Sequence, residues 1–161
     1  MKLKPLLCMA ATIPLFACTS VVDVVNDQAT IQPNEARVDF YVQRTDRERD
    51  FVHLMCENHR PNSEIEVLDV RAGEHVLYVK SSVINSNLLF KNVREAVVRF
   101  DVNLEGGKRY MLNQTREGDR VELWLQEADS GLIVSNKVST TVNLASAVGN
   151  LRMKQCREGT V

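Results

Sequence analysis

A two-residue alternation of apolar and polar side chains runs through most of the chain and limits the folds available to it. Successive side chains of an extended strand point to opposite faces, so this period marks strands with one buried face. Turn signals rich in glycine, aspartate and asparagine separate the alternating segments, and no long amphipathic helical pattern lies among them. Short strands at this spacing predict an all-β fold, mainly an antiparallel β-sandwich.

Individual strands can be placed from the same pattern. Residues 37–43 alternate and predict the first strand, and the charged run 44–50 is expected to be a loop, because so many charges are not easily buried. Residues 51–56 return to apolar character and predict the second strand. Further along, turn signals between alternating segments predict a three-stranded meander over residues 108–136.

Two glycine-containing segments of like construction, Ala72 to Leu77 and Gly106 to Tyr110, each follow an alternating stretch and precede a β-prone run. Each therefore predicts a hairpin. Together they resemble the paired hairpins of small transthyretin-like or PEGA-like β-sandwich domains found in bacterial lipoproteins, over roughly residues 65–135. The resemblance implies a transthyretin-like or immunoglobulin-like sandwich without known catalysis, and it provides no functional residue.

The segment 138–156 is open to two interpretations. Asn143 is a candidate helix cap, with Leu144, Val148 and Leu151 at helical spacing after it. The β-prone run from residue 138 favours a last strand instead. The prediction is therefore an all-β domain that ends in one short helix or in a further strand.

The N-terminus has the build of a secretory signal peptide, because Lys2 and Lys4 precede an apolar stretch that ends at Ala17. The stretch is too short for a transmembrane helix, which needs about 20 apolar residues. Its end, Leu15-Phe16-Ala17-Cys18, resembles the bacterial lipobox. That resemblance implies removal of residues 1–17 and lipidation of Cys18 with a diacylglyceryl group and an N-acyl chain. The alternative is a plain secreted protein in which Cys18 happens to follow an alanine.

The residue after the lipidated cysteine bears on location. In lipoproteins of enteric-type bacteria an aspartate there keeps the protein in the inner membrane, whereas this chain has Thr19. The resemblance thus implies the outer membrane of a Gram-negative bacterium, with the soluble part facing the periplasm. We expect residues 18–36 to form the lipidated N-terminus and tether, 37–156 the sandwich domain, and 157–161 a tail.

The cysteines predict one disulfide. Of the four, Cys8 leaves with the signal and Cys18 is lipidated, so Cys56 and Cys156 remain. In an oxidising compartment a lone pair of cysteines is most simply a disulfide. Closing a loop of about 100 residues would stabilise the domain by roughly 2–5 kcal/mol.

The charge balance argues against nucleic acid as a partner. Without the two signal lysines, 18 basic residues face 21 acidic ones, and no basic cluster is present that would attract anionic lipid. The partners that remain are the membrane, through the lipid, and an envelope protein or glycan.

The spacing His53-x-x-Cys56-x-x-His59 is the one pattern that suits zinc or copper. Three ligands fall short of the four in a structural zinc site, and strand residues three apart face opposite sides. Since Cys56 is also expected in the disulfide, we expect no metal and no cofactor. The sequence contains no nucleophile elbow, glycine-rich phosphate loop or His-Glu-x-x-His motif, which makes an enzyme the weaker class.

A contact surface is a further candidate in the segment 81–92, where apolar side chains lie among serines and asparagines. Exposed apolar groups with a polar rim often mark a binding site, whereas in a small domain they can also cover the open end of the core. The candidate residues are Val83, Ile84, Leu88, Leu89 and Phe90.

These patterns predict an outer-membrane lipoprotein with a non-catalytic β-sandwich, acting in envelope structure, in assembly, or in binding a protein or glycan. The alternative function is a lipid-anchored periplasmic metal-binding protein or hydrolase that uses the segment from His53 to His59.

Overall fold

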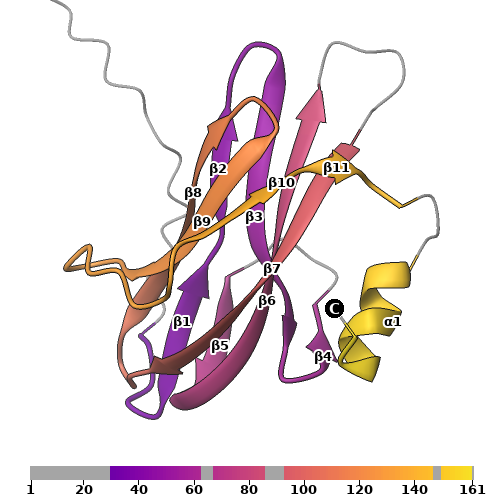
Figure 1. Cartoon of the computed structure of the whole chain (residues 1–161). Coiled ribbons are helices and arrows are strands. Elements are labelled where there is room, and N and C mark those ends of the chain that lie inside the picture. The colour runs from indigo at the N-terminus through magenta and orange to yellow at the C-terminus, as the bar shows by residue number, and fades with distance from the viewer. Residues whose placement is uncertain (1–29, 63–66, 86–92, 147–149, 161) are drawn as a thin grey trace, which may run out of the picture.

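Two β-sheets pack face to face, and a short helix follows the last strand (Figure 1). The computed structural model describes residues 30–62, 67–85, 93–146 and 150–160. Paired strands run antiparallel except β1 and β8, which are parallel. The predicted all-β sandwich is confirmed.

Each sheet draws strands from both halves of the chain. The first sheet has five strands in the order β10 (Val138–Thr141), β9 (Arg120–Glu127), β8 (Arg109–Glu117), β1 (Glu35–Asp39) and β5 (Leu68–Arg71). The second sheet has the order β11 (Asn143–Leu144), β7 (Val93–Leu104), β6 (Gly73–Asn85), β3 (Glu48–Glu57) and β2 (Tyr41–Arg44), and β4 (Arg60–Pro61) pairs with β3. In the meander predicted over residues 108–136, β8 and β9 are the first two strands. The strand that pairs with β9 on its other side is β10, which begins only at Val138. Between them, Gln126 and Ile133 form a single isolated β-bridge.

The two predicted glycine hairpins were wrong, because both turns carry the chain from one sheet to the other. β5 pairs with β1 whereas β6 pairs with β7, so the turn at Gly73 is a corner between sheets, and the turn at Gly107 is another. The corners meet beside the start of β1, where the Gly107 N–H donates to the Glu35 carbonyl at 2.7 Å. A Cβ on Gly106 would lie 2.0 Å from the Pro33 carbonyl oxygen, so this close approach requires glycine.

The predicted first strand is two strands in different sheets. β1 pairs in the first sheet and β2 in the second, and the chain crosses at Phe40. Before the crossing Val38 faces the core, while after it Tyr41 packs against the core. A crossing at Val142 joins β10 to β11 in the same way. At each crossing the backbone passes directly from one sheet to the other.

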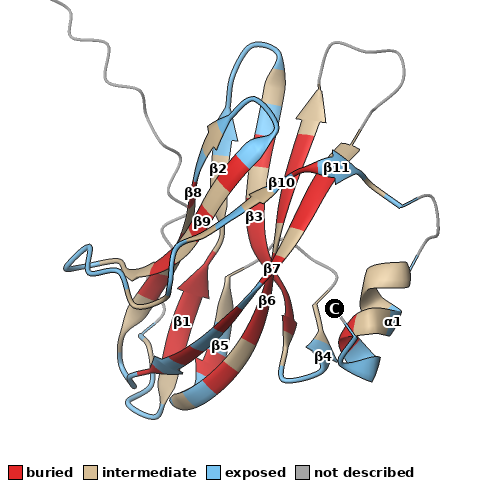
Figure 2. Ribbon diagram, viewed as in Figure 1, coloured by how far each residue is buried: buried red, intermediate tan, exposed pale blue. Residues whose placement is uncertain are grey.

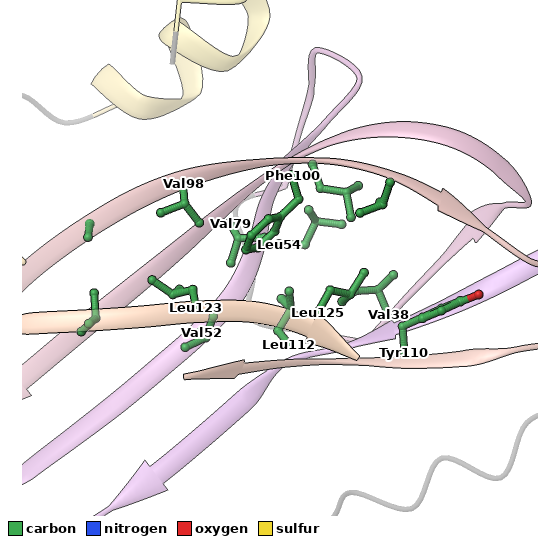
Figure 3. Close-up of a cluster of buried hydrophobic side chains, with 14 of the residues drawn as sticks. Val38, Val52, Leu54, Val79, Val98, Phe100, Tyr110, Leu112, Leu123 and Leu125 are labelled. Atoms are coloured by element: carbon green, nitrogen blue, oxygen red, sulfur yellow. The ribbon is translucent and has the colours of Figure 1, made fainter. Parts of the chain in front are cut away.

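The core lies between the two sheets, where buried positions alternate along the central strands (Figure 2). Figure 3 shows side chains of the two sheets facing one another across this space. Full burial of such an aliphatic or aromatic side chain stabilises the fold by about 1.5–3 kcal/mol. The core residues labelled there are Val38, Val52, Leu54, Val79, Val98, Phe100, Tyr110, Leu112, Leu123 and Leu125.

The charged run 44–50 is only partly the predicted loop. The turn occupies residues 45–47, and β3 begins at Glu48. Asp50 is 3% exposed. It is buried in spite of its charge because Arg116, on the opposite sheet, donates from Nε to its Oδ2 at 2.7 Å.

Both interpretations of the segment 138–156 are correct, each for a different part of it. β10 and β11 come first, and helix α1 (Leu151–Glu158) follows. Asn143 lies in β11 and does not cap the helix, because the chain stays extended there to pair with β7. The helix begins after Asn150 and ends at Gly159, whose φ is 67°.

Candidate functional site

The predicted Cys56–Cys156 disulfide is confirmed, with an S–S distance of 2.02 Å and a Cα–Cα distance of 5.8 Å. It fastens α1 to the face of the second sheet that points away from the core. The register of β3 shifts between Leu54 and Cys56, and Met55, Tyr78 and the two cysteines form a small apolar cluster separate from the main core. The bond joins residues 100 positions apart.

The residues of the candidate metal spacing have three separate environments. His53 is buried on the outer face of β3, and the sulfur of Cys56 is engaged in the disulfide. The exposed His59 lies at the end of α1, where its Nδ1 donates to the Cys156 carbonyl at 3.3 Å. Within the described ranges no group of three or more His, Cys, Asp or Glu residues could hold a metal ion. Of the three residues, Cys56 and His59 hold α1 to the sheet.

Two of the five candidate contact residues lie in the described part of the chain. β6 extends to Asn85, so Val83 is a core residue at 0% exposure and Ile84 is half-buried. Val83 is thus no surface contact, because the strand continues further than the serines and asparagines suggested. Leu88, Leu89 and Phe90 lie outside the described residues.

The proposed lipidation residue Cys18 also lies outside the described residues, as does the signal segment. In the part of the chain that is described, no helix has the length and apolar character needed to cross a bilayer.

A pocket of about 310 Å³ lies between the first turn of α1 and the outer face of the second sheet. The register of β3 and β6 places His53 directly opposite Lys80, and the register of β6 and β7 places Ser82 opposite Glu95. The sheet thus presents adjacent polar side chains beneath the helix. The lining residues are His53, Met55, Asn62, Lys80, Glu95, Ser146, Asn150, Leu151, Arg152 and Met153.

His53 is the most unusual residue of this pocket. It is 5% exposed, and its Nδ1 is buried with no hydrogen-bond partner. Burial, helped by the charge of Lys80, lowers the pKa of His53 to about 4. Both influences disfavour the imidazolium form, so at neutral pH the ring is uncharged.

The other charges in the pocket are only partly balanced. Arg152 donates from Nε to the Glu95 carboxylate at 2.8 Å, and this pair ties the helix to β7. Lys80 is half-buried and makes no ion pair with the described residues. Among the described lining residues there is therefore one positive charge in excess.

A second polar cluster lies between the sheets, and its side chains form hydrogen bonds with one another. Asp50 accepts from Arg116 at 2.7 Å and from the Gln114 amide at 3.1 Å. The Gln114 oxygen accepts from Ser81 at 2.7 Å, and Arg116 also donates to Glu48 at 2.6 Å. This cluster joins β3 and β6 to β8, so its role is to hold the sheets together.

His75, which sequence analysis left without a role, connects three segments. It is 6% exposed, and its Nε2 donates to the Arg71 carbonyl at 2.6 Å. Its Nδ1 lies 2.9 Å from the Glu57 carboxylate. The ring thereby fastens the corner between β5 and β6 to the end of β3.

The sequence singled out His53 as part of the spacing with Cys56 and His59, whereas in the structure it lies apart from both. The residues that line the pocket together with His53 were not predicted. Lys80 carries the only charge in the β-prone run 75–85 apart from the histidine, which is the signal that could have marked it. The inter-sheet cluster had a clearer signal, because Ser81 and Gln114 interrupt otherwise apolar inward positions. A polar residue on a buried face needs a partner.

No protein-family model, curated protein or solved structure matches the chain.

Proposed function

We propose that this chain is an outer-membrane lipoprotein of a Gram-negative bacterium, anchored through lipid on Cys18. The residues between Cys18 and β1 lead from the lipid to the sandwich, which faces the periplasm. The domain is non-catalytic and acts in envelope structure, in assembly, or by binding a protein or glycan. Stable anchoring takes at least two acyl chains, as a mature lipoprotein has.

The observation that carries this proposal is the Cys56–Cys156 disulfide. Disulfides persist in oxidising compartments such as the periplasm and are rare in the cytosol. Of the four cysteines, this bond uses two, and Cys8 lies within the apolar signal segment. Cys18 is the one left, at the position where the lipobox pattern places the lipidated thiol.

The ion pairs of the domain support a structural or binding role over a catalytic one. Arg116 binds Asp50 across the sheets, and Arg37 binds Asp69 through two hydrogen bonds at 2.7 and 2.8 Å between neighbouring strands. Charged groups that satisfy one another in this way stabilise the geometry of the sheets and are not free to react with a substrate.

Replacement of the anchoring cysteine tests the proposal. Cells producing the full chain are fed an alkyne-tagged fatty acid, and membrane and soluble fractions are compared for the parent, Cys18→Ala and Cys8→Ala. We expect label and membrane attachment in the parent and in Cys8→Ala, whose altered residue leaves with the signal, and loss of both in Cys18→Ala. An unlabelled parent, with Cys18→Ala equally membrane-bound, would contradict the proposal.

A further inference from the structure

We propose that the pocket between α1 and the outer face of the second sheet binds a carboxylate group, presented by a small organic acid, between Lys80 and the N-terminal end of α1. This site stands on the geometry of the pocket and does not depend on the lipid anchor.

The first element of the site is the N-terminal end of α1. The residues around its first turn, from Asn150 to Met153, line the pocket. Asn150 makes no side-chain capping bond, and the first turn contains no acidic residue. Backbone N–H groups at a helix start lack partners within the helix, and the helix dipole favours negative charge there. Such an end is suited to an anion from outside the helix.

The second element, which is independent of the helix, is His53. This side chain is more than nine-tenths buried, lines the pocket and has no hydrogen-bond partner at Nδ1. A buried polar side chain without a partner is uncommon in folded proteins and calls for an explanation. The neutral tautomer with its proton on Nε2 leaves only a lone pair on the shielded Nδ1 and places a donor on the other nitrogen, where a carboxylate oxygen can accept it.

The charges select a monoanion. Lys80 contributes one positive charge without a partner among the described residues, while Arg152 and Glu95 neutralise each other at 2.8 Å. One carboxylate therefore balances the charge of the described lining residues. A phosphate dianion would carry excess negative charge beside the Glu95 carboxylate, and like charges at short range repel.

The size of the pocket sets the kind of ligand. Its volume of about 310 Å³ is at the lower end of the range of about 300–1,000 Å³ typical of small-molecule sites. Met55, Leu151 and Met153 supply apolar contact beside the polar groups. The site thus fits a carboxylate attached to a short, partly apolar group.

The test uses the full chain, purified from membranes in detergent and labelled with ¹⁵N. N-acetylalanine is titrated as the carboxylate probe, its amide serves as the neutral control of equal size, and inorganic phosphate is the competing anion. The readouts are the backbone amide signals of residues 151–153 and the ring signals of His53. We expect saturable shifts of both sets with N-acetylalanine and much weaker effects from the amide and from phosphate.

Variants separate this site from nonspecific attraction. Lys80→Met should weaken binding about tenfold or more, an effect equivalent to about 1.4 kcal/mol, and Lys80→Arg should retain most of it. Lys154→Met is the matched control, because this exposed lysine of the same helix pairs with Glu158 and does not line the pocket. Thermal melting verifies the fold of each variant, and His53→Gln provides a second weakened variant if Lys80→Met does not fold.

Three results of the titrations would overturn the site. They are the absence of saturable shifts at residues 151–153, equal binding of the acid and its amide, and phosphate binding as tightly as N-acetylalanine. Unchanged affinity in both folded Lys80→Met and His53→Gln would overturn it as well.

Discussion

Asp50 shows how a single residue can hold two sheets together. Its carboxylate is 3% exposed and is reached from the opposite sheet by Arg116 and Gln114. The same contact raises the pKa of Arg116, because the carboxylate favours the charged guanidinium. Removing the Asp50 carboxylate would leave Arg116 paired with Glu48 alone and would weaken the acceptor of the buried Gln114 amide.

We therefore expect Asp50→Asn to lower the free energy of unfolding by about 1–3 kcal/mol. Asp101→Asn is the matched control, because Asp101 pairs with Arg99 at the surface with its side chain 66% exposed. Exposed pairs contribute about 0–1 kcal/mol. Urea denaturation of the two variants measures the difference, and equal losses would contradict the role assigned to Asp50.

His53 predicts a pH dependence of stability. Its pKa is about 4 in the folded chain against an ordinary 6.5, so between these values the unfolded chain binds a proton that the folded chain does not. Stability is fully present above about pH 6.5 and falls towards pH 4, by about 3 kcal/mol in total.

His53→Gln should remove that share of the pH dependence. Met55→Leu, which changes another lining residue without a titratable group, should leave it in place. Urea denaturation at several pH values between 4 and 7 measures the slope. If the slope of His53→Gln matched that of the parent, the titration of His53 would not be its source.

At the residue scale, the two-residue alternation of the sequence predicts most of the buried apolar side chains but not the buried polar ones. Val79 and Leu112 follow the alternation and lie in the core. Ser81, Gln114 and Asp50 occupy equivalent inward positions, and their partners come from another sheet. A local pattern can mark such polar positions but contains no information about which distant residue supplies the partner, so the pairing within the cluster could not be predicted.

At the scale of elements, turn chemistry located the corners of the chain but not the pairing of the strands. The turn at Gly118 is a hairpin between β8 and β9, as its neighbours predicted. Those at Gly73 and Gly107 have the same glycine signature and join different sheets. Glycine permits the backbone to reverse, whereas the partner of each strand is decided by which apolar face it completes. The crossing at Phe40 had no local signal.

Helix α1 depends on its covalent attachment. It has eight residues, and Cys156 is its one buried residue. Isolated helices shorter than about 12–15 residues are marginal in water, so packing and the disulfide must hold this one in place. The bond is also expected to contribute roughly 2–5 kcal/mol to the whole domain.

We expect the double variant Cys56→Ala/Cys156→Ala to expose α1 to protease while the strands remain protected. Trypsin should cleave after Arg152 or Lys154 much faster than in the oxidised parent. Mass spectrometry of the fragments identifies the cleavage sites. Equal resistance of α1 in the two proteins would show that packing alone holds the helix.

At the scale of the whole molecule, the pocket and the first described strand belong to different layers. β1 belongs to the first sheet, whereas α1 lies beside the second sheet (Figure 1). The pocket lies between α1 and the outer face of that second sheet. Under the proposed anchoring, the helix-covered face is therefore formed by a different sheet from the one that contains β1.

The central claim, a disulfide-locked domain held to a bilayer by lipid on Cys18, is tested most directly by one measurement. This is the intact mass of the protein extracted from membranes without reducing agent. We predict the mass of residues 18–161 plus a diacylglyceryl group and one N-linked acyl chain, less the two hydrogens lost in forming the Cys56–Cys156 bond. A mass without acyl groups, or one that retains residues 1–17, would contradict the claim.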